Sequence, residues 1–257
     1  MNPINRYVFS ILKDLFKSKP KQILSDLSDI GVDMHSHLIP GIDDGSKSNE
    51  QSLEMISRLQ DYGFSKLITT PHIMSGGYDN TTSIIQKGSE SLNLYLEKNK
   101  VDIELKCSSE YYLDGHFDDL IKQKDLMPIG DNYILFEFSY MFRPTDGERV
   151  IFDLGLDGFR PILAHPERYN YMADKNLSKL KTLKDTGVLF QLNLFSLVGG
   201  YGPIAQKVGE HLIRERMIDF VGTDLHNPLQ LEYLNKLLES ESLMDLIQQD
   251  QLKNKVL

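Results

Sequence analysis

The segment GVDMHSHLIPGIDDGSKSNEQSLEM, residues 31–55, contains the patterns of a strand, a turn and a helix in direct succession. GVDMH at 31–35 is interpreted as a short buried strand. GIDDG at 41–45 combines glycine with aspartate, which is typical of turns. Ser48 and Gln51 then have the spacing of a capping box at the start of a helix. The segment therefore predicts one β-strand followed by one α-helix.

The same alternation continues along the rest of the chain. Six further runs predict strands: KLITT (66–70), IELKCSS (103–109), YILFEF (133–138), PILAH (161–165), VLFQLN (188–193) and DFVGTD (219–224). Helical patterns are found near residues 82–98, 147–156, 176–186, 203–216 and 229–239. Apolar strands that are each followed by a helix favour a parallel sheet covered on its outer face. Because no linker interrupts the seven units, we predict a single domain that forms a closed or nearly closed α/β barrel.

The first 22 residues differ from the rest in charge. They carry a net charge of +4 within a chain of net charge −9, so the remaining residues carry −13. Five apolar residues recur at helical spacing and predict a short amphipathic helix before Pro20: Val8, Ile11, Leu12, Leu15 and Phe16. We expect this helix to pack on the protein or to fray. Contact with a membrane surface is the less favoured interpretation.

Composition excludes several classes of protein. A net charge of −9 disfavours a nucleic-acid binder, which needs a basic face. No apolar run approaches the roughly 20 residues that span a bilayer, and the opening lacks the features of a secretory signal. The single cysteine, Cys107, cannot form an internal disulfide. We therefore expect a cytoplasmic protein.

Histidines and carboxylates gather where the predicted strands end. Five of the seven histidines occupy such positions: His35, His37, His72, His165 and His226. Five carboxylates occupy equivalent positions: Asp43, Asp44, Glu110, Glu137 and Asp224. The carboxyl ends of parallel barrel strands meet on one face, so these side chains are predicted to form one cluster.

The residue types in this cluster favour metal binding. His-x-His and Asp-x-His place both side chains on one side of a strand, and a mixed imidazole and carboxylate shell suits Mn, Fe or Zn. Glu137 lies inside an apolar run and needs a cation or another strong partner. Four carboxylates with three divalent ions would leave a site of charge +2, which suits a phosphate-ester dianion.

Each feature also has a simpler interpretation. The histidines could be surface or core residues, GIDDG could be only a turn, and Glu137 could pair with a buried arginine. For His116 and His211, which lie away from the predicted strand ends, we expect no role in the site. The ordered coincidence along the chain favours the metal site.

The motifs together resemble a known family. DMHSHLIPGIDDGSKSNEQSLEM is followed in order by TTPH (69–72), SSEYY (108–112), FEF (136–138), AHPERY (164–169) and TDLHN (223–227). This series resembles the PHP (polymerase and histidinol phosphatase) superfamily over about residues 31–230. Within it, the chain looks most like the manganese-dependent protein-tyrosine phosphatases of bacterial capsular and exopolysaccharide gene clusters.

The resemblance implies a fold and a set of site residues. The fold is a distorted (β/α)7 TIM-like barrel, the PHP fold, over residues 31–257, after an N-terminal helical extension at 1–30. The implied ligands of three divalent ions, Mn²⁺ with Fe or Zn as alternatives, are His35, His37, Asp44, His72, Glu110, Glu137, His165, Asp224 and His226. Arg168 is expected to hold the phosphoryl group, or else to form a salt bridge at the barrel rim. Asp43 is expected to support the catalytic site from behind the ligands.

The implied reaction is hydrolysis of phosphotyrosine by metal-bound hydroxide, with the tail of a bacterial tyrosine kinase as the expected partner. A cysteine mechanism is excluded because Leu113 stands where a Cys-x5-Arg loop based on Cys107 would need arginine. Three alternatives remain open: a phosphoesterase acting on a small ester such as histidinol phosphate, a metal-dependent amidohydrolase, and a non-catalytic scaffold.

The sequence also departs from its relatives. Some of them have a second phosphate-binding arginine after Asp-x-His, whereas HNPLQLEY (226–233) contains none. Some have basic residues after the histidine of the second strand, whereas HIMSGGYDN (72–80) has none. Arg143 and Arg149 are the candidates to replace the missing arginine.

Overall fold

The computed structural model describes residues 23–257, so the helix predicted near the N-terminus lies outside the described residues. The strands are β1 (Val32–Asp33), β2 (Lys66–Thr69), β3 (His72–Ile73), β4 (Glu104–Cys107), β5 (Glu110–Tyr112), β6 (Tyr133–Glu137), β7 (Arg160–Ala164), β8 (Leu189–Asn193) and β9 (Phe220–Gly222). The α-helices are α2 (Asn49–Asp61), α3 (Thr82–Lys98), α4 (Gly115–Gln123), α5 (Gly147–Leu156), α6 (Ser178–Asp185), α7 (Gly202–Arg214), α8 (Glu232–Leu238) and α9 (Glu241–Gln248). Short 3-10 helices are η1 (Pro166–Arg168), η2 (Asn170–Met172), η3 (Leu194–Val198), η4 (Pro228–Leu231) and η5 (Asn254–Val256).

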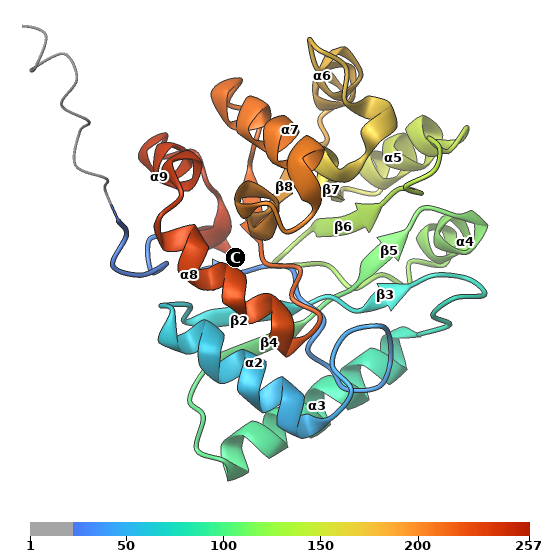
Figure 1. The fold of residues 1–257 in the computed structure, drawn as a ribbon. Helices are drawn as coiled ribbons and strands as arrows, with labels where there is room; N and C mark the ends of the chain where they lie inside the picture. The colour runs from blue at the N-terminus through green and yellow to red at the C-terminus, as the bar shows by residue number, and fades with distance from the viewer. Residues whose placement is uncertain (1–22) are drawn as a thin grey trace, which may run out of the picture.

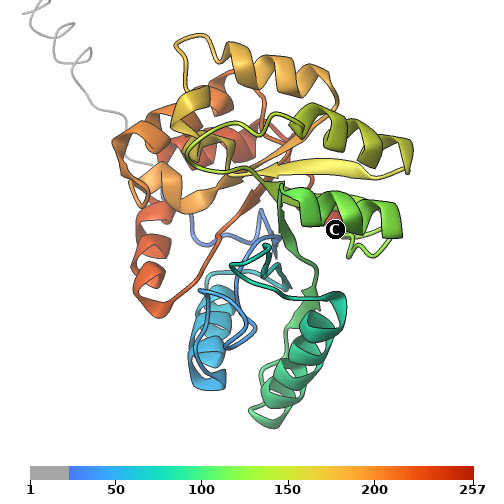
Figure 2. The ribbon, with the colours of Figure 1, turned by 90° about the vertical axis from the view of Figure 1, so that its right-hand side faces the viewer.

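The strands form two parallel sheets, which confirms the predicted α/β class. The smaller sheet has the order β1-β2-β4, and the larger has the order β3-β5-β6-β7-β8-β9. Figure 1 shows the strands at the centre with the helices around them. Figure 2 shows α2 and α3 together on one side of the molecule, while the later helices surround the larger sheet.

Two of the predicted strands are each followed closely by a second strand that was not predicted. The run at 66–70 contains β2, and β3 begins beyond it after Thr70 and Pro71; the run at 103–109 contains β4, and β5 begins beyond it at Glu110. β2 and β4 pair with each other in the smaller sheet, whereas β3 and β5 pair in the larger one. Proline has no N–H to donate to a ladder, so Pro71 favours a break at this point. The chain therefore passes from one sheet to the other at both places.

β1 and β9 are edge strands of the two sheets, and they are connected by the side chain of Asn254 and by a backbone bridge beyond their ends. The Asn254 amide donates to Val32 O at 2.9 Å and to Val221 O at 2.7 Å, and it accepts from Val221 N at 3.0 Å. Beyond the strand ends, Ser36 and Leu225 form an isolated parallel bridge. No continuous ladder joins β1 to β9 among residues 23–257, so a closed barrel stays a prediction.

Apolar side chains fill both sides of the strands. One core cluster packs helix residues such as Leu59, Leu92 and Leu212 against the strands. A smaller cluster combines strand residues from both sheets, among them Val32, Ile68 and Phe220. The two sheets are thus joined by a shared core. Among the described helices, none has the length and apolar character needed to cross a membrane.

The observed helices follow their capping residues. Ser48 accepts a hydrogen bond from Gln51 N at the start of α2, and Thr81 accepts one from Ile84 N at the start of α3. α3 and α5 have the predicted bounds. Two helices were not predicted: α4 begins after Asp114, which accepts from Phe117 N, and α9 begins after Ser240, which accepts from Leu243 N.

Candidate metal centre

Most of the predicted site residues end or follow a parallel strand, whereas His72 and Glu110 begin β3 and β5, just beyond the carboxyl ends of β2 and β4. His35 and His37 follow β1, His72 begins β3, Glu110 begins β5, Glu137 ends β6, His165 follows β7, and Asp224 and His226 follow β9. The register aligns His72 with Glu110, and Glu137 with Tyr112 two residues further along β5. Parallel pairing therefore brings these distant segments to one edge, as expected for strand ends in this class of fold.

The prediction that His-x-His at 35–37 lies in a strand is wrong. β1 ends at Asp33, so both histidines lie in the segment beyond it. Backbone hydrogen bonds hold this segment against the one after β9: His37 N donates to Leu225 O at 3.0 Å, and Asp224 N donates to His35 O at 2.7 Å. The two imidazoles still converge, with 3.4 Å between their Nε2 atoms.

Two site residues have a left-handed backbone. φ is +35° at His165 and +52° at Asp224. Residues other than glycine adopt this region at a cost, and such residues cluster at functional sites. Asp-x-His at 224–226 lies beyond β9 and is therefore oriented by this left-handed backbone and not by strand periodicity.

Three groups of side chains have the geometry to hold metal ions. In each, one nitrogen or oxygen atom per residue lies within 4.8 Å of the others. The groups are His37, Asp44, His72 and His226; His35, His37, Glu110 and Asp224; and His72, Glu110 and Glu137. Because they share His37, His72 and Glu110, the three groups form one continuous cluster.

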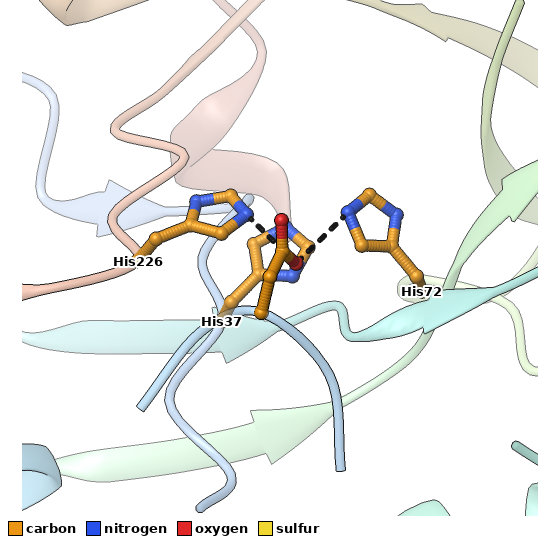
Figure 3. A group of neighbouring side chains, drawn as sticks. His37, His72 and His226 are labelled. Atoms are coloured by element: carbon orange, nitrogen blue, oxygen red, sulfur yellow. Dashed lines mark ion pairs between the residues drawn. The ribbon is translucent and has the colours of Figure 1, made fainter. Parts of the chain in front are cut away.

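Asp44 lies at the open side of the cluster. Its Oδ1 is 3.5 Å from His72 Nε2 and 3.5 Å from His226 Nε2, and these pairs are the dashed lines in Figure 3. His37, His72 and His226 come together from three separate segments in the same view. The side chain of Asp44 is 51% exposed, whereas that of His37 is fully buried. Asp44 therefore faces the solvent side, and the other ligand candidates lie deeper.

Glu110 is at the buried centre of the cluster. Its Oε2 is 3.1 Å from His35 Nε2 and 3.3 Å from His72 Nδ1, and its Oε1 is 2.9 Å from His165 Nε2. Burial by itself would raise the pKa of Glu110. The adjacent imidazoles of His35 and His72 outweigh burial and hold that pKa well below its usual range.

Glu137 has the buried position that its sequence context predicted. The residue is 2% exposed, and Oε1 is 3.3 Å from His72 Nδ1. Burial, and then the negative charges of Glu110 and Asp224, raise the pKa of Glu137 well above its usual range. No arginine pairs with it directly among the described residues, so the predicted need for a cation remains.

The donor atoms fit divalent ions. His72 Nδ1, His165 Nδ1 and Asp224 Oδ1 are buried and have no hydrogen-bond partner within residues 23–257. Buried polar atoms are normally paired, because an unpaired one loses its hydration without compensation. His35 Nε2, His37 Nε2 and Glu110 Oε2 lie within 3.4 Å of one another. A mixed set of imidazoles and carboxylates is the shell that Mn, Fe or Zn prefers.

Gln191 supports the cluster from behind, and the sequence analysis missed it. Its Oε1 accepts from His35 Nδ1 at 2.8 Å, while its Nε2 donates to Leu192 O at 2.9 Å. Because the Nε2 group must face a carbonyl, the oxygen faces His35 and the proton of His35 lies on Nδ1. His35 Nε2 is then free as a ligand atom. The signal was a polar residue within the apolar run VLFQLN, the same signal that identified Glu137.

Asn193 and Glu167 form a second support. Asn193 Nδ2 donates to Asp224 Oδ2 at 3.0 Å, and Asn193 N donates to Glu167 Oε1 at 3.2 Å. Ser196 Oγ also donates to Glu167 Oε1, at 2.7 Å. Glu167 is fully buried, and burial raises its pKa to about 7. These contacts fix the position of the Asp224 carboxylate.

Asp43 lies behind the histidines. Its Oδ2 accepts from His37 Nδ1 at 2.8 Å and from His72 N at 3.2 Å, and its Oδ1 accepts from Gly45 N at 2.9 Å. Burial would raise the pKa of Asp43, but the adjacent imidazole of His37 outweighs it and lowers that pKa. A carboxylate on the outer nitrogen of a histidine orients the ring and fixes its tautomer.

Arg168 reaches the cluster from η1. Its Nη1 donates to Asp224 Oδ2 at 2.7 Å. Its guanidinium carbon lies 4.0 Å from the ring centre of Tyr201 and 4.8 Å from that of Tyr140. Both tyrosines were missed from the sequence, because nothing in their local pattern places them at the site.

The remaining candidates lie elsewhere. Arg143 pairs with Glu148 at 2.6 Å, and Arg149 pairs with Asp118 at 3.0 Å and with Asp153 at 2.8 Å. His116 is exposed on α4, and His211 faces Glu215 on α7 at 3.8 Å. Neither histidine was expected in the site. Both arginines are neutralised by carboxylates of their own surface.

Comparisons with known proteins indicate the family to which the chain belongs. The sequence model of the family described as capsular polysaccharide synthesis, CpsB/CapC, matches residues 31–240. The chain is 31% identical to tyrosine-protein phosphatase YwqE of Bacillus subtilis over 197 residues, 76% of this chain and 77% of that protein. It is 25% identical to tyrosine-protein phosphatase CpsB of Streptococcus agalactiae over 202 residues, 76% of this chain and 83% of that protein.

A solved structure is also similar. It comes from a study of YwqE from B. subtilis and CpsB from Streptococcus pneumoniae, described as metal-dependent tyrosine phosphatases. The TM-score is 0.76 at 28% identity, over 87% of this chain and 94% of that one. The family model, which matches residues 31–240, covers every strand that carries a residue of the cluster. The chain therefore belongs to the CpsB/CapC family of capsular polysaccharide synthesis proteins.

Proposed function

We propose that this protein is a metal-dependent protein-tyrosine phosphatase. The observation that carries the proposal is the buried cluster in which Glu110 lies within 3.3 Å of His35, His72 and His165. A cluster of this kind is not expected in an ordinary hydrophobic core, because unpaired buried carboxylates and imidazoles destabilise the fold. The activity named for the family relatives is the one that this chemistry suits.

The proposed ligands are the eight residues of the three groups together with His165, whose Nε2 lies 2.9 Å from Glu110 Oε1. The proposed ions are three Mn²⁺, with Fe or Zn as alternatives. Support comes from the three overlapping groups, each of which offers a set of imidazole and carboxylate atoms. Divalent ions bound there supply a nucleophile from water near neutral pH and neutralise charge on the phosphoryl oxygens.

The chain's own residues supply binding and orientation. Arg168 is proposed to hold the phosphoryl group, since a guanidinium matches two phosphoryl oxygens with two N–H donors. Gln191 and Asp43 orient His35 and His37 through the ring nitrogens that face away from the cluster. Asn193 and Arg168 together hold Asp224 Oδ2, which leaves Oδ1 directed at the histidines.

We also propose the finer form of the fold. The strands would close into a distorted (β/α)7 barrel that forms one domain over residues 31–257, with residues 1–30 as an extension. The bridge of Ser36 to Leu225, the Asn254 contacts and the core cluster drawn from both sheets support closure.

The proposed substrate is a phosphotyrosine protein, and the proposed partner is the phosphorylated tail of a bacterial tyrosine kinase that regulates capsule or exopolysaccharide synthesis. Phenolate leaves readily, with a conjugate-acid pKa of about 10, so the reaction depends less on a strong general acid. The capsular description of the family supports this placement.

The test is hydrolysis of a phosphotyrosine peptide by metal-stripped full-length protein titrated with Mn²⁺. We expect release of phosphate that depends on the metal, is lost in His35→Ala and persists in His116→Ala, whose histidine is exposed on α4. Phosphoserine peptide and histidinol phosphate are run in parallel. Turnover of histidinol phosphate but not of the phosphotyrosine peptide would contradict the proposal and favour the small-ester phosphatase.

A further inference from the structure

The guanidinium of Arg168 contacts two tyrosine rings. Its central carbon is 4.0 Å from the ring centre of Tyr201 and 4.8 Å from that of Tyr140, and both distances suit cation–π attraction. We name Tyr140 and Tyr201 the tyrosine clamp. The clamp joins two segments that are distant in sequence, the turn after β6 and the start of α7.

Both rings of the tyrosine clamp are held in place. Tyr140 stacks on His165 with 5.7 Å between ring centres and on Tyr169 with 5.6 Å. The Tyr201 hydroxyl lies 3.4 Å from Asp224 Oδ2, to which it donates, and accepts from Gln230 Nε2 at 3.4 Å. The clamp is therefore anchored to two candidate ligands, His165 and Asp224, and not only to the arginine.

Part of the guanidinium remains free to bind an anion. Nη1 is occupied by Asp224, whereas Nε and Nη2 have no hydrogen-bond acceptor within residues 23–257. The Arg168 side chain is 19% exposed, so these donors can meet a ligand. Two N–H groups on one guanidinium match two oxygens of a phosphoryl group.

Neither of the other two candidate arginines, Arg143 and Arg149, shares this role with Arg168. Arg143 and Arg149 are paired with carboxylates away from the cluster. An arginine loses about 2 kcal/mol of side-chain conformational entropy when it is ordered, so a single arginine binds more tightly if it is ordered before the ligand arrives. The tyrosine clamp supplies that order.

We propose that Tyr140 and Tyr201 are positioning residues that hold Arg168 so that Nε and Nη2 face the phosphoryl group. The inference rests on the proposed function for the identity of the substrate, but its direct subject is the binding of a phosphate dianion. The tyrosine clamp thereby orders the one arginine that holds the phosphoryl group, a task that a second arginine would otherwise share.

The test measures the Kd of inorganic phosphate for Mn²⁺-loaded full-length protein by calorimetry. Tyr201→Leu and Tyr140→Leu are each expected to raise Kd roughly three- to tenfold, because the cation–π contact is lost. Tyr201→Phe keeps the ring but loses the hydroxyl that donates to Asp224 Oδ2, so its Kd is expected to lie between those of the wild type and Tyr201→Leu. Metal content, measured on every variant, is expected to be unchanged.

A double-mutant cycle separates positioning from a structural role. In an Arg168→Gln background, Tyr201→Leu is expected to change Kd by less than about twofold, because the residue it positions is absent. Tyr233→Leu is the matched control, since Lys236 lies 4.7 Å from that ring on α8. If Tyr201→Leu does not fold, Tyr140→Leu serves in the same cycle, because Tyr140 is 43% exposed.

Two outcomes would overturn the inference. Equal weakening by the leucine variants in both backgrounds would show that the tyrosines act through the metals or the fold. Unchanged Kd in the leucine variants, or a wild-type protein that does not bind phosphate, would show that no positioning occurs. A wild type that binds phosphate but does not hydrolyse phosphotyrosine would contradict only the proposed function.

Discussion

Gln191 determines which nitrogen of His35 faces the candidate metal centre. Replacing it in Gln191→Leu removes the acceptor of the His35 Nδ1 proton, which lies 2.8 Å away, and leaves that N–H buried without a partner. We expect the affinity for Mn²⁺ to fall about 10- to 100-fold, as for other supporting partners of ligand histidines. Metal titration of stripped protein gives the Kd.

The matched control is Gln206→Leu, because Gln206 also donates from its amide to a backbone oxygen, Leu197 O at 3.1 Å, but lies on α7 away from the cluster. It is expected to keep the wild-type affinity. Equal affinities in Gln191→Leu and the wild type would show that His35 does not depend on this contact.

Adjacent aspartates in GIDDG are predicted to differ in role. Asp44 faces the open group with His72 and His226, so Asp44→Asn should lower the number of ions bound. Asp43 contacts His37 on its outer nitrogen, so Asp43→Asn should keep the number of ions but weaken their binding, by about 10- to 100-fold. Elemental analysis at saturating and limiting Mn²⁺ distinguishes the two. The reverse pattern would make Asp43 the ligand.

The side chains that the sequence identified differ in kind from those it missed. His72 and Glu110 were predictable because charged or titratable residues at successive strand ends are unusual in a core. Tyr140 and Tyr201 were not, because tyrosines are common at every kind of surface and their contact with Arg168 depends on loops. Ligand candidates thus have a pattern in sequence, whereas the residues that orient them are defined by tertiary contacts.

At the level of elements, Asn254 replaces a missing ladder between β1 and β9. Its amide forms three hydrogen bonds to Val32 and Val221, and the residue is 1% exposed. Asn254→Ala would leave one buried N–H and two buried carbonyls without partners. We expect the free energy of unfolding to fall by about 2–4 kcal/mol, measured by urea denaturation.

Asn99→Ala is the control for this change, because Asn99 is exposed and its side-chain amide donates to Tyr95 O at the end of α3. Its expected cost is below about 1 kcal/mol. A similar small cost for Asn254→Ala would mean that the contact between β1 and β9 contributes little to stability.

The elements themselves were predictable where local signals agree. α3 and α5 have the predicted bounds, because apolar residues recur at helical spacing between clear ends. The short strand β3 that follows the run at 66–70 was not predicted, because its formation depends on pairing with β5 in the other sheet. α4 was missed although DGHFDDLIKQ has an N-cap aspartate and a buried apolar face with Phe117 and Leu120.

At the level of the whole molecule, the buried carboxylates of the candidate metal centre lower the stability of the metal-free protein. Glu110, Glu137 and Asp224 are carboxylates that are all nearly fully buried at the centre of the fold. Bound ions compensate their charge and bind only the folded chain. At a free Mn²⁺ concentration of 100 times Kd, binding adds about 2.7 kcal/mol per ion. We expect Mn²⁺ to raise Tm by roughly 5–10 °C for each ion bound, relative to protein in chelator, measured by scanning fluorimetry.

Relative to the wild type, Glu137→Gln is predicted to be at least as stable without metal and to gain less stability from Mn²⁺. The glutamine has nearly the same shape but no charge, and Glu137 is 2% exposed beside Glu110 and Asp224. In chelator, its Tm should equal or exceed that of the wild type, because glutamine is neutral without the proton uptake that the raised pKa of buried Glu137 requires. With Mn²⁺ its Tm should rise less, because a ligand oxygen has lost its charge. Glu215→Gln, which removes surface pairs with Lys181 and His211, should respond to Mn²⁺ as the wild type does. If Glu137→Gln instead lowered Tm equally in chelator and in Mn²⁺, Glu137 would be a structural residue, and the third group of the cluster would not hold an ion.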